Sequence, residues 1–326
     1  TPEKYRNRYP IYIPTKGRYE SMYTMRALEN LEVPYICLVE PQEVELYKKE
    51  LKARDYKWYH IIELPFSNHG KGSGPARNFA WEHSKAHGFR RHWVMDDNIF
   101  EFWRFFNNSR IKFDTGSFFR AWEDWNDRFL NLKMSGLQYK FFVMDSYHYK
   151  PVLLNSRLMS CILIENDLEH RWRGKWNEDV DLSIRTLKSG YCTALSYTFL
   201  CGKARTGTIK GGNTSEVYED YKNASPNVED DPAYKKSKML VDLHPDCVQL
   251  VKRYGRWHHH VDISRFSTNK LIIDPNVTWS PEPNEYGLKL AVDYNSDDQS
   301  YTKSFRANEL GMKNPRFINF DKELLV

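Results

Sequence analysis

The chain has 326 residues, of which 40% are hydrophobic, and its formal net charge is +5. This length suffices for one large core, or for one α/β domain with a smaller addition. The basic excess is compatible with an anionic partner but is far below that of a histone-like arm. No apolar run reaches about 18 residues, so we expect no membrane span. The polar, basic segment Thr1 to Tyr9 lacks the apolar part of a secretory signal.

Cysteine usage indicates the redox setting of the chain. The cysteines are odd in number and form no C-x-x-C pair; they are Cys37, Cys161, Cys192, Cys201 and Cys247. This pattern favours buried thiols over a zinc site or a disulfide framework. We therefore expect a reducing, cytoplasmic location.

The first hundred residues alternate between strand-like and helix-like patterns. Strands are expected at residues 11–13, 35–39, 60–64 and 92–95, and helices at 21–31, 44–54 and in the segment that ends at Gly88. Continuous apolar runs such as Tyr35 to Val39 are typical of buried parallel strands. The alternation predicts an α/β fold with a central, mostly parallel sheet, whose ligands bind at the carboxyl ends of the strands.

The remaining segments complete the expected organisation. Helical spacing of Phe118, Trp122, Trp125 and Phe129 predicts a helix over 117–129 that packs into the core. Further elements are expected as a strand at 157–164, a polar loop at 165–176, a helix that ends at Gly190, a strand at 192–200 and a helix at 245–254. The expected division is an α/β domain over 1–208, a mobile loop over 209–236 and a small helical and β C-terminal extension over 237–326 that packs on the domain.

Two acidic residues stand where a buried strand meets solvent. The segment Trp93 to Asn98 ends in Asp96, Asp97 and Asn98. Hard divalent cations such as Mn²⁺ or Mg²⁺ prefer oxygen ligands and remain bound to phosphates and water. A carboxylate pair at this place can hold a metal with a diphosphate. A solvated turn that merely ends the strand is the alternative.

A second acidic cluster crowds the first turn of a predicted helix. It consists of Glu178, Asp179 and Asp181. Transfer to a hydroxyl needs a carboxylate within hydrogen-bond reach of the attacking oxygen, and neighbouring acids raise the pKa of that carboxylate toward a useful value. Helix capping and interaction with the helix dipole could equally account for these residues.

A glycine-rich loop precedes the helix that ends at Gly88. The segment Gly70 to Asn78 lets the backbone approach a ligand closely, and Arg77 at the helix start could meet a phosphate. The loop matches neither the dinucleotide fingerprint nor the P-loop, so it is a weak signal by itself.

Together, these motifs resemble family 2-type glycosyltransferases, which have the Rossmann-like GT-A fold. The resemblance covers roughly residues 9 to 200 and consists of Ile13 to Arg18, Glu40 after the second strand, Gly72 to Ala80, Asp96 to Asn98, and Glu178 to Arg185 followed by Gly190 and Tyr191. Two positions depart from the family pattern, because Asn98 stands for the third acidic residue of the metal motif and Glu40 for the usual aspartate at the nucleobase site.

The resemblance implies a UDP-sugar donor and a Mn²⁺ or Mg²⁺ ion. The donor-binding residues would be Pro14, Thr15, Arg18, Glu40, Gly72, Arg77 and Asp96. The metal would be held by Asp96, Asp97 and Asn98, completed by a histidine of the run 258–260, with His258 and His260 as the candidates. Asp179 would be the catalytic base of an inverting transfer, and Glu178 or Asp181 would position the acceptor.

A narrower resemblance is to phage TET-associated glycosyltransferases, which are proposed to decorate oxidised methyl groups on DNA pyrimidines. It is carried by Ile11 to Arg18, Met95 to Asp97, Ile209 to Thr214 and Tyr254 to Asp262. It implies transfer of a hexose to 5-hydroxymethylcytosine in DNA, within the host cytoplasm. Trp172 and Trp176 would stack on a flipped base, and Lys210 would bring a positive charge to the diphosphate from a loop that closes over it.

Three alternatives remain open at the level of sequence. The acceptor could be a glycan, a lipid or a protein. The chain could be a sugar-nucleotide nucleotidyltransferase, although its first strand lacks the glycine-rich loop of those enzymes. It could also be a non-catalytic DNA-binding module, whose binding would need neither metal nor nucleotide sugar.

Overall fold

One large mixed sheet organises the molecule. The computed structural model describes residues 1, 3–204, 211–212, 228–277, 286, 289–295, 300–306 and 318–319. In this part of the chain the strands lie in the order β15 (Ile318–Asn319), β13 (Lys289–Asn295), β14 (Ser300–Arg306), β6 (Ser109–Phe113), β5 (Ile99–Phe106), β10 (Cys192–Lys203), β7 (Leu132–Tyr139), β9 (Cys161–Glu165), β4 (Arg91–Met95), β1 (Ile11–Thr15), β2 (Tyr35–Val39) and β3 (Tyr59–Glu63). Strand β8 (Val152–Leu154) pairs with β10.

The direction of the strands places the carboxyl ends of the parallel strands along a single edge of this sheet. Strands β3, β2, β1 and β4 pair in parallel. Strand β9 runs antiparallel to both β4 and β7, and β10 is parallel to β7. Strands β1, β2, β3, β4, β7 and β10 therefore point the same way, and their carboxyl ends share one edge. This arrangement confirms the α/β fold of the GT-A type and the edge at which ligands were expected.

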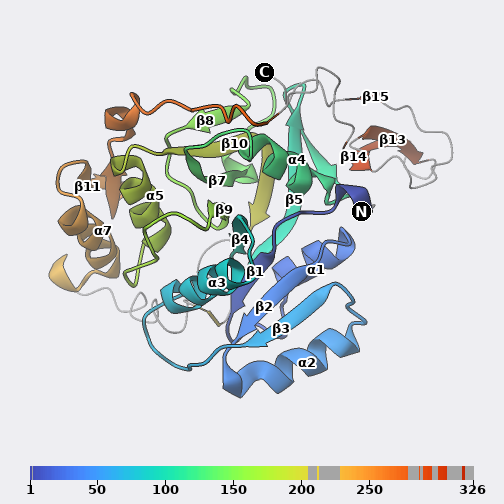
Figure 1. The fold of residues 1–326 in the computed structure, drawn as a ribbon, viewed down its shortest axis with the longest axis horizontal. Coiled ribbons are helices and arrows are strands. Elements are labelled where there is room, and N and C mark those ends of the chain that lie inside the picture. Colours follow the sequence, from blue (N-terminus) through green and yellow to red (C-terminus); the bar gives the residue numbers. More distant parts are fainter. Residues whose placement is uncertain are drawn as a thin grey trace.

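The helices cover the two faces of the sheet (Figure 1). They are α1 (Tyr23–Asn30), α2 (Val44–Ala53), α3 (Gly74–Ala86), α4 (Ser117–Asn126), α5 (Glu178–Lys188) and α7 (Pro232–Leu243), with short 3₁₀ turns at Glu3–Tyr5, Pro41–Glu43, Lys140–Phe142, Val228–Asp230 and Ile263–Phe266. Across the described residues, no helix combines the length and apolar character that crossing a membrane requires.

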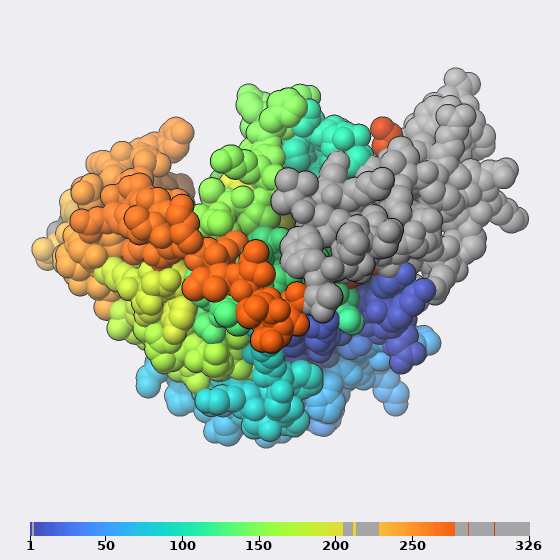
Figure 2. Space-filling model, turned by 45° about the horizontal axis from the view of Figure 1, so that its top comes forward, coloured from blue at the N-terminus to red at the C-terminus, as the bar shows by residue number. Residues whose placement is uncertain are grey.

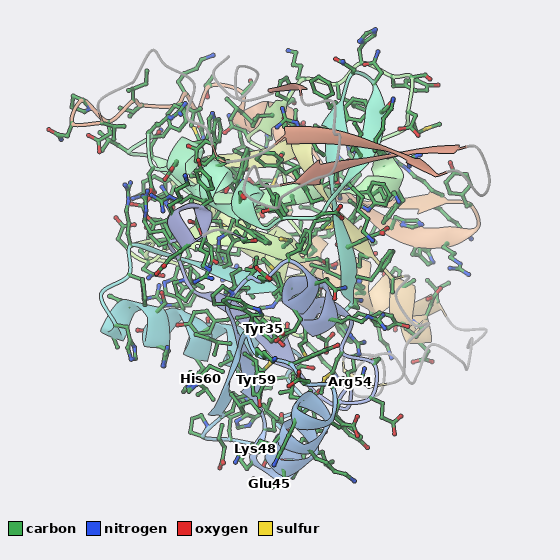
Figure 3. All side chains as sticks on the ribbon, turned by 90° about the vertical axis from the view of Figure 1, so that its right-hand side faces the viewer. Tyr35, Glu45, Lys48, Arg54, Tyr59 and His60 are labelled. Atoms are coloured by element: carbon green, nitrogen blue, oxygen red, sulfur yellow. The ribbon has the colours of Figure 1, made fainter. Side chains whose placement is uncertain are left out.

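Helix α2 illustrates how an amphipathic sequence is oriented on the sheet. Val44, Tyr47 and Leu51 are buried. Glu45 and Lys48 form an exposed pair, 2.8 Å apart, on the opposite face. Figure 3 shows this pair at the lower margin of the molecule. Apolar residues three or four positions apart therefore direct one face to the core, as helical periodicity requires.

Aromatic side chains fill the main core. Phe118 and Trp122 of α4 are fully buried, and the Phe118 ring stacks on Phe113 with centroids 4.4 Å apart. The sequence-based assignment of the aromatic repeat to core packing is thus confirmed. The cysteines are also buried and form no disulfide, as predicted.

The segment after residue 228 differs from the expected organisation. A hairpin of β11 (Val248–Arg253) and β12 (Arg256–Val261) stands where a helix was expected at 245–254. The helix lies earlier, as α7, and starts inside the predicted loop 209–236. Asp231 caps it by accepting a hydrogen bond from the Ala233 amide at 2.8 Å, with Pro232 following. This start signal outweighs the polar composition on which the loop prediction was based.

The C-terminal extension packs on the helix that carries the second acidic cluster. Val180, Ile184 and Leu187 of α5 share one apolar cluster with Leu240 of α7 and with residues of the hairpin. Strand β14 pairs in parallel with β6, so the last described strands extend the main sheet. The division of the chain at 208 and 237 into a domain, a loop and an extension stays a prediction.

A buried ion-pair cluster joins α5 to the end of α7. Asp181 is fully buried, with Arg173 at 3.0 Å, Arg185 at 2.8 Å and His244 Nε2 at 2.8 Å. Burial opposes ionisation of Asp181, but the hydrogen bonds from His244 and Arg173 outweigh it and lower its pKa to about 2. The sequence suggested that Asp181 positions an acceptor. In the structure it instead holds two helices together.

Removing this carboxylate tests its structural role. Asp181→Ala leaves the largely buried Arg185 and the buried His244 without their carboxylate partner, so we expect the free energy of unfolding to fall by about 3 kcal/mol. Denaturant titration followed by circular dichroism measures the change. Asp242→Ala is the matched control, because Asp242 pairs with Lys238 on an exposed face of α7. Equal transition midpoints for the two variants would contradict the assignment.

Candidate active site

A cavity of about 660 Å³ opens at the shared carboxyl edge of the parallel strands. Its size is typical of a small-molecule site. Strand ends and the loops that follow them supply Thr15, Glu40, Asp96, Tyr139 and Lys203. Other lining groups come from the start of α3, from the start of α5 and from the β11–β12 hairpin. The predicted edge of the sheet is therefore where the structure places the cavity.

Asp96 pairs with two cations and a hydroxyl group in this cavity. One carboxylate oxygen accepts from Arg77 Nη2 at 2.7 Å. The other accepts from Lys203 Nζ at 2.8 Å and from Ser160 Oγ at 2.7 Å. Burial opposes ionisation of Asp96, but the Lys203 and Arg77 charges outweigh it and hold its pKa well below the usual range. Asp96 is thus a fixed anion between two cations.

Asp97 points to the turn that follows β1. It forms an ion pair with Arg18 and accepts a hydrogen bond from Thr15 Oγ1 at 2.8 Å. Thr15 Oγ1 in turn lies 2.7 Å from the Tyr47 hydroxyl. Burial raises the pKa of Asp97, and the Arg18 charge opposes that shift. Asp97 therefore fixes the end of β1 and the turn that follows it against the end of β4.

Arg77 joins the glycine-rich loop to the second acidic cluster. Its Nη1 lies 3.7 Å from Glu178 Oε1, which also accepts from Ser73 Oγ at 2.7 Å. Its guanidinium lies over the Trp172 ring, 4.6 Å from the centroid. At Gly72, with φ of +72°, an added Cβ would approach the Lys175 carbonyl oxygen to 2.9 Å, so the close packing of the two loops requires glycine.

Asp179 lies on the first turn of α5 and faces the cavity. Burial raises its pKa to about 6, and the neighbouring Glu178 charge adds to the shift while Arg77 opposes it. A carboxylate with such a pKa is an effective proton acceptor near neutral pH. The three acids of this turn therefore separate by role: Asp179 faces the cavity, Glu178 binds Arg77 and Ser73, and Asp181 is structural.

Glu40 lies at the end of the cavity beyond β2. Its carboxylate accepts from Gln42 Nε2 at 2.6 Å and from the Asn68 amide at 3.0 Å, and it pairs with Lys16 at 3.0 Å. Burial opposes ionisation of Glu40, but these hydrogen bonds outweigh it and lower its pKa. The oriented carboxylate suits recognition of N–H donors.

Two glycines bring a distant segment to the turn after β1. The Gly212 amide donates to the Lys16 carbonyl at 2.7 Å, and Arg18 Nη2 donates to the Gly211 carbonyl at 3.2 Å. An added Cβ on Gly211, whose φ is +84°, would lie 2.2 Å from the Gly17 carbonyl oxygen. The glycines of this segment are therefore needed for close approach, whereas Lys210 lies outside the described residues.

The expected metal site has a different arrangement in the structure. Both carboxylates are already paired with arginine or lysine, as described above, and His258 lines the cavity whereas His260 does not. Among the described residues, no three His, Cys, Asp or Glu side chains come together as a metal would require. Among the predicted ligands, Asn98 is the one whose side-chain oxygen is buried without a hydrogen-bond partner in the described structure. This donor set does not fit a divalent ion, because an ion at Asp96 would have to displace Lys203.

The predicted aromatic platform is also absent from the cavity wall. Neither Trp172 nor Trp176 lines the cavity. Trp172 is 3% exposed and its ring packs against the Arg77 guanidinium, so the ring cannot receive a base. Lys175 lies over the Trp176 ring, 5.5 Å from the centroid. The structure therefore does not support stacking on Trp172, whereas the acceptor role of Trp176 stays a prediction.

Several lining residues were not anticipated from the sequence. They are Phe66, His69, Tyr139, Phe142, Arg157, Met159, Lys203, Lys236 and Arg253. Lys203 lies three positions after the predicted strand 192–200, so the strand-end rule applied to Asp96 could have found it. His259 is the histidine of the run with a clear electrostatic signature, because burial and then the Arg157 and Lys236 charges lower its pKa to about 4.

Comparison with protein families gives the chain its classification. A family model described as TET-Associated Glycosyltransferase matches residues 9–212. The chain belongs to this family. The matched range contains the turn after β1, the Asp96 and Asp97 pair, Arg77 and the acidic turn of α5, so the cavity is the candidate active site of this glycosyltransferase.

Solved structures and curated proteins add little to this classification. A crystal structure of S. aureus TarS 1–349 has a TM-score of 0.40 at 10% identity, with 73% of each chain covered. Its UDP-GlcNAc complex has a TM-score of 0.42 at 12% identity, with 73% of this chain and 66% of that chain covered. Its UDP complex has a TM-score of 0.38 at 15% identity, and the chain spans 57% of its length. No curated protein matches the chain.

The raised pKa of Asp179 predicts a specific pH dependence of transfer. The carboxylate is protonated below its pKa of about 6 and then cannot accept a proton. Turnover should therefore decline as the pH falls through about 6, and stay constant above it. Asp179→Asn should lower turnover by about 10²-fold and abolish this dependence. Initial rates of nucleotide release measure both effects, and an unchanged pH profile in the variant would assign the base elsewhere.

Proposed function

We propose that this glycosyltransferase moves a hexose from a UDP-sugar to the hydroxyl group of 5-hydroxymethylcytosine in DNA. The observation that carries the proposal is Asp179, a cavity-facing carboxylate with a raised pKa, beside the cations that flank Asp96. Membership of the TET-associated family supports DNA as the acceptor. The buried free thiols support a reducing, cytoplasmic location as part of the same proposal.

The donor half of the cavity would be built from the first strands. Glu40 would accept hydrogen bonds from the uracil, and Thr15 and Arg18 would border the ribose and phosphates. Arg77 and Lys203 flank Asp96 with positive charge. Burial would lower the pKa of Lys203, but Asp96 outweighs it and raises that pKa, so the ammonium stays charged. A diphosphate next to these cations would be stabilised as it leaves.

The reaction follows from this arrangement for an inverting transfer. The acceptor hydroxyl oxygen forms a bond to the anomeric carbon of the sugar. The bond from that carbon to the β-phosphate oxygen breaks, and UDP leaves with the electron pair. The hydroxyl proton passes to Asp179, whose pKa is suited to accept it. Glu178, held by Ser73 and Arg77, fixes the first turn of α5 in place.

The metal dependence expected from the sequence is not part of this proposal. Lys203 lies on the Asp96 oxygen that a divalent ion would use. The positive charge opposite the leaving diphosphate is therefore assigned to side chains of the chain itself. The mechanism above needs no further cation.

The acceptor class can be tested directly. The protein is incubated with a panel of UDP-sugars and duplex DNA that contains 5-hydroxymethylcytosine, and the digested nucleosides are analysed by mass spectrometry. We expect a mass increase of one hexose on the modified base only. DNA with unmodified cytosine, free sugars and a glycan serve as control acceptors. Transfer to a control acceptor without transfer to DNA would overturn the DNA assignment.

Lys203 gives a second prediction. Lys203→Met removes the ammonium at the diphosphate, and we expect turnover to fall by about 10²-fold. Lys48→Met, on the exposed face of α2, is the matched control. We also expect full turnover of the native protein in excess EDTA, measured as UDP release. Loss of turnover in EDTA that is restored by Mn²⁺ would show that a metal, and not Lys203, carries this charge.

A further inference from the structure

The tip of the β11–β12 hairpin presents an unusual tyrosine. Tyr254 is 100% exposed and has φ of +51°, and Gly255 follows with φ of +74°. Arg253 and Arg256 pair across the hairpin on either side of this two-residue turn. Positive φ at both turn positions defines a tight hairpin turn in which Asn-Gly is the preferred sequence.

Neither burial nor backbone geometry explains a tyrosine at position 254. Its ring contributes no burial to the core, because it is fully exposed. A positive φ is unfavourable for a bulky side chain and much less so for asparagine. Residues held in such conformations without a packing reward point to a contact outside the folded chain.

The hairpin tip belongs to the active-site cavity and carries positive charge. Arg253 and Tyr254 line the same cavity as Asp179. Residues 248–261 include lysine, arginine and histidine but no acidic residue. In the part of the chain that the structure describes, no carboxylate pairs with Arg253 or with Arg256. These guanidinium groups are available to phosphates.

The hairpin is held in place by the helix behind it. The Trp257 ring meets Tyr234 of α7 edge-on, with centroids 5.4 Å apart. Val248 and Val261 at the base of the hairpin are buried in the cluster with Leu240. The exposed tip therefore projects from a packed support.

A second exposed aromatic group lines the cavity from the turn after β7. Phe142 is 54% exposed and packs against Phe141, with ring centroids 4.3 Å apart. Arg157 also lines the cavity. In Figure 2 the segment around residue 150, in bright green, and the segment around residue 250, in orange, form separate projections of the surface. The cavity thus has exposed aromatic side chains, Phe142 and Tyr254, from two segments that are distant in sequence.

We propose that Tyr254 is a wedge that enters the base stack of duplex DNA while the target base rotates into the cavity and lies against Phe142. Arg253 and Arg256 would hold the phosphates on either side of the extruded nucleotide. This inference rests on the proposed function, because it assumes a DNA acceptor. It adds the residues that open the duplex and receive the base.

The size of the site makes extrusion of the base necessary. Asp179 faces a cavity of about 660 Å³, which admits a nucleotide but not a duplex. A base that reacts there must leave the stack, at the cost of unstacking and unpairing. Side chains that fill the vacated place lower this cost, and stacking on an aromatic ring stabilises the extruded base.

The test separates opening of the duplex from chemistry. Tyr254→Asn removes the ring while suiting the positive φ, so its thermal unfolding midpoint should equal or exceed that of the native protein. Tyr254→Phe keeps the ring, and Phe89→Asn removes an exposed ring at the opposite edge of the sheet as a matched control. The acceptors are duplex DNA, single-stranded DNA and duplex DNA with a mismatch at the 5-hydroxymethylcytosine. A 2-aminopurine beside the target reports unstacking by fluorescence in the presence of UDP, without sugar transfer.

We expect Tyr254→Asn to lose at least about tenfold in transfer rate on the matched duplex, and to keep the native rate on single-stranded and mismatched DNA. Its fluorescence increase on the matched duplex should be lost, whereas Tyr254→Phe and Phe89→Asn should behave as the native protein. Phe142→Ala should lose rate on all three acceptors, because every acceptor base must be received.

Three outcomes would overturn the wedge. They are a native rate of Tyr254→Asn on the matched duplex, an equal loss on all acceptors, and a native protein that leaves the 2-aminopurine fluorescence unchanged. If the native protein raises the fluorescence but transfers no sugar to any DNA, the proposed function fails and the wedge stands. If it transfers sugar to DNA without unstacking the neighbouring base, the wedge fails and the proposed function stands.

Discussion

The ion pairs of Asp96 are the interaction on which the rest of the active site depends. A single carboxylate at the end of β4 binds Arg77 from α3, Lys203 from β10 and Ser160 from the start of β9. These groups come from elements that are distant in sequence and adjacent at one edge of the sheet. Parallel strand direction brings the elements together, and the carboxylate fixes their side chains. An anion buried without such partners would be too costly to keep charged.

The same ion pairs influence the pKa of Asp179 on the first turn of α5. Arg77 faces both Asp96 and Glu178 and is supported by the Trp172 ring. Burial and the Glu178 charge raise the pKa of Asp179, while Arg77 and Lys203 limit that rise. The cations next to the expected diphosphate therefore also tune the base, so donor binding and proton transfer share one electrostatic system.

The sequence predicts the first half of the fold well, because its signals there are local. Continuous apolar runs, glycine turns and helical spacing place β1 to β4 and α1 to α3 within a few residues of their observed bounds, and the strand-end rule locates the cavity. The partners of Asp96 could not be predicted in this way. Lys203 lies 107 positions away in the chain, so its contact with Asp96 follows from strand order, which no local pattern contains.

Errors in the site prediction have the same physical origin. Trp172 is in a polar loop, which suggested exposure, but the structure buries its ring beneath Arg77. Asp181 stands beside Asp179 in sequence yet lies on the buried side of α5, because two positions along a helix differ by more than half a turn. The segment 245–254 was taken as helical, although Val248 finds its burial through pairing with Val261.

Helix α5 has two faces with separate tasks. One face presents Asp179 to the cavity. The other face packs against α7 and the hairpin through Val180, Ile184 and Leu187. For protein engineering, this limits what can be exchanged as a module. Under the proposed function, Tyr254 at the hairpin tip is the position to vary for a different range of acceptors, since its side chain is fully exposed and contributes nothing to the core. Grafting the whole segment 228–266 from a homologue would replace the packing partners of the helix that holds the base, so such chimaeras should keep the α5 face and its partners from the same parent.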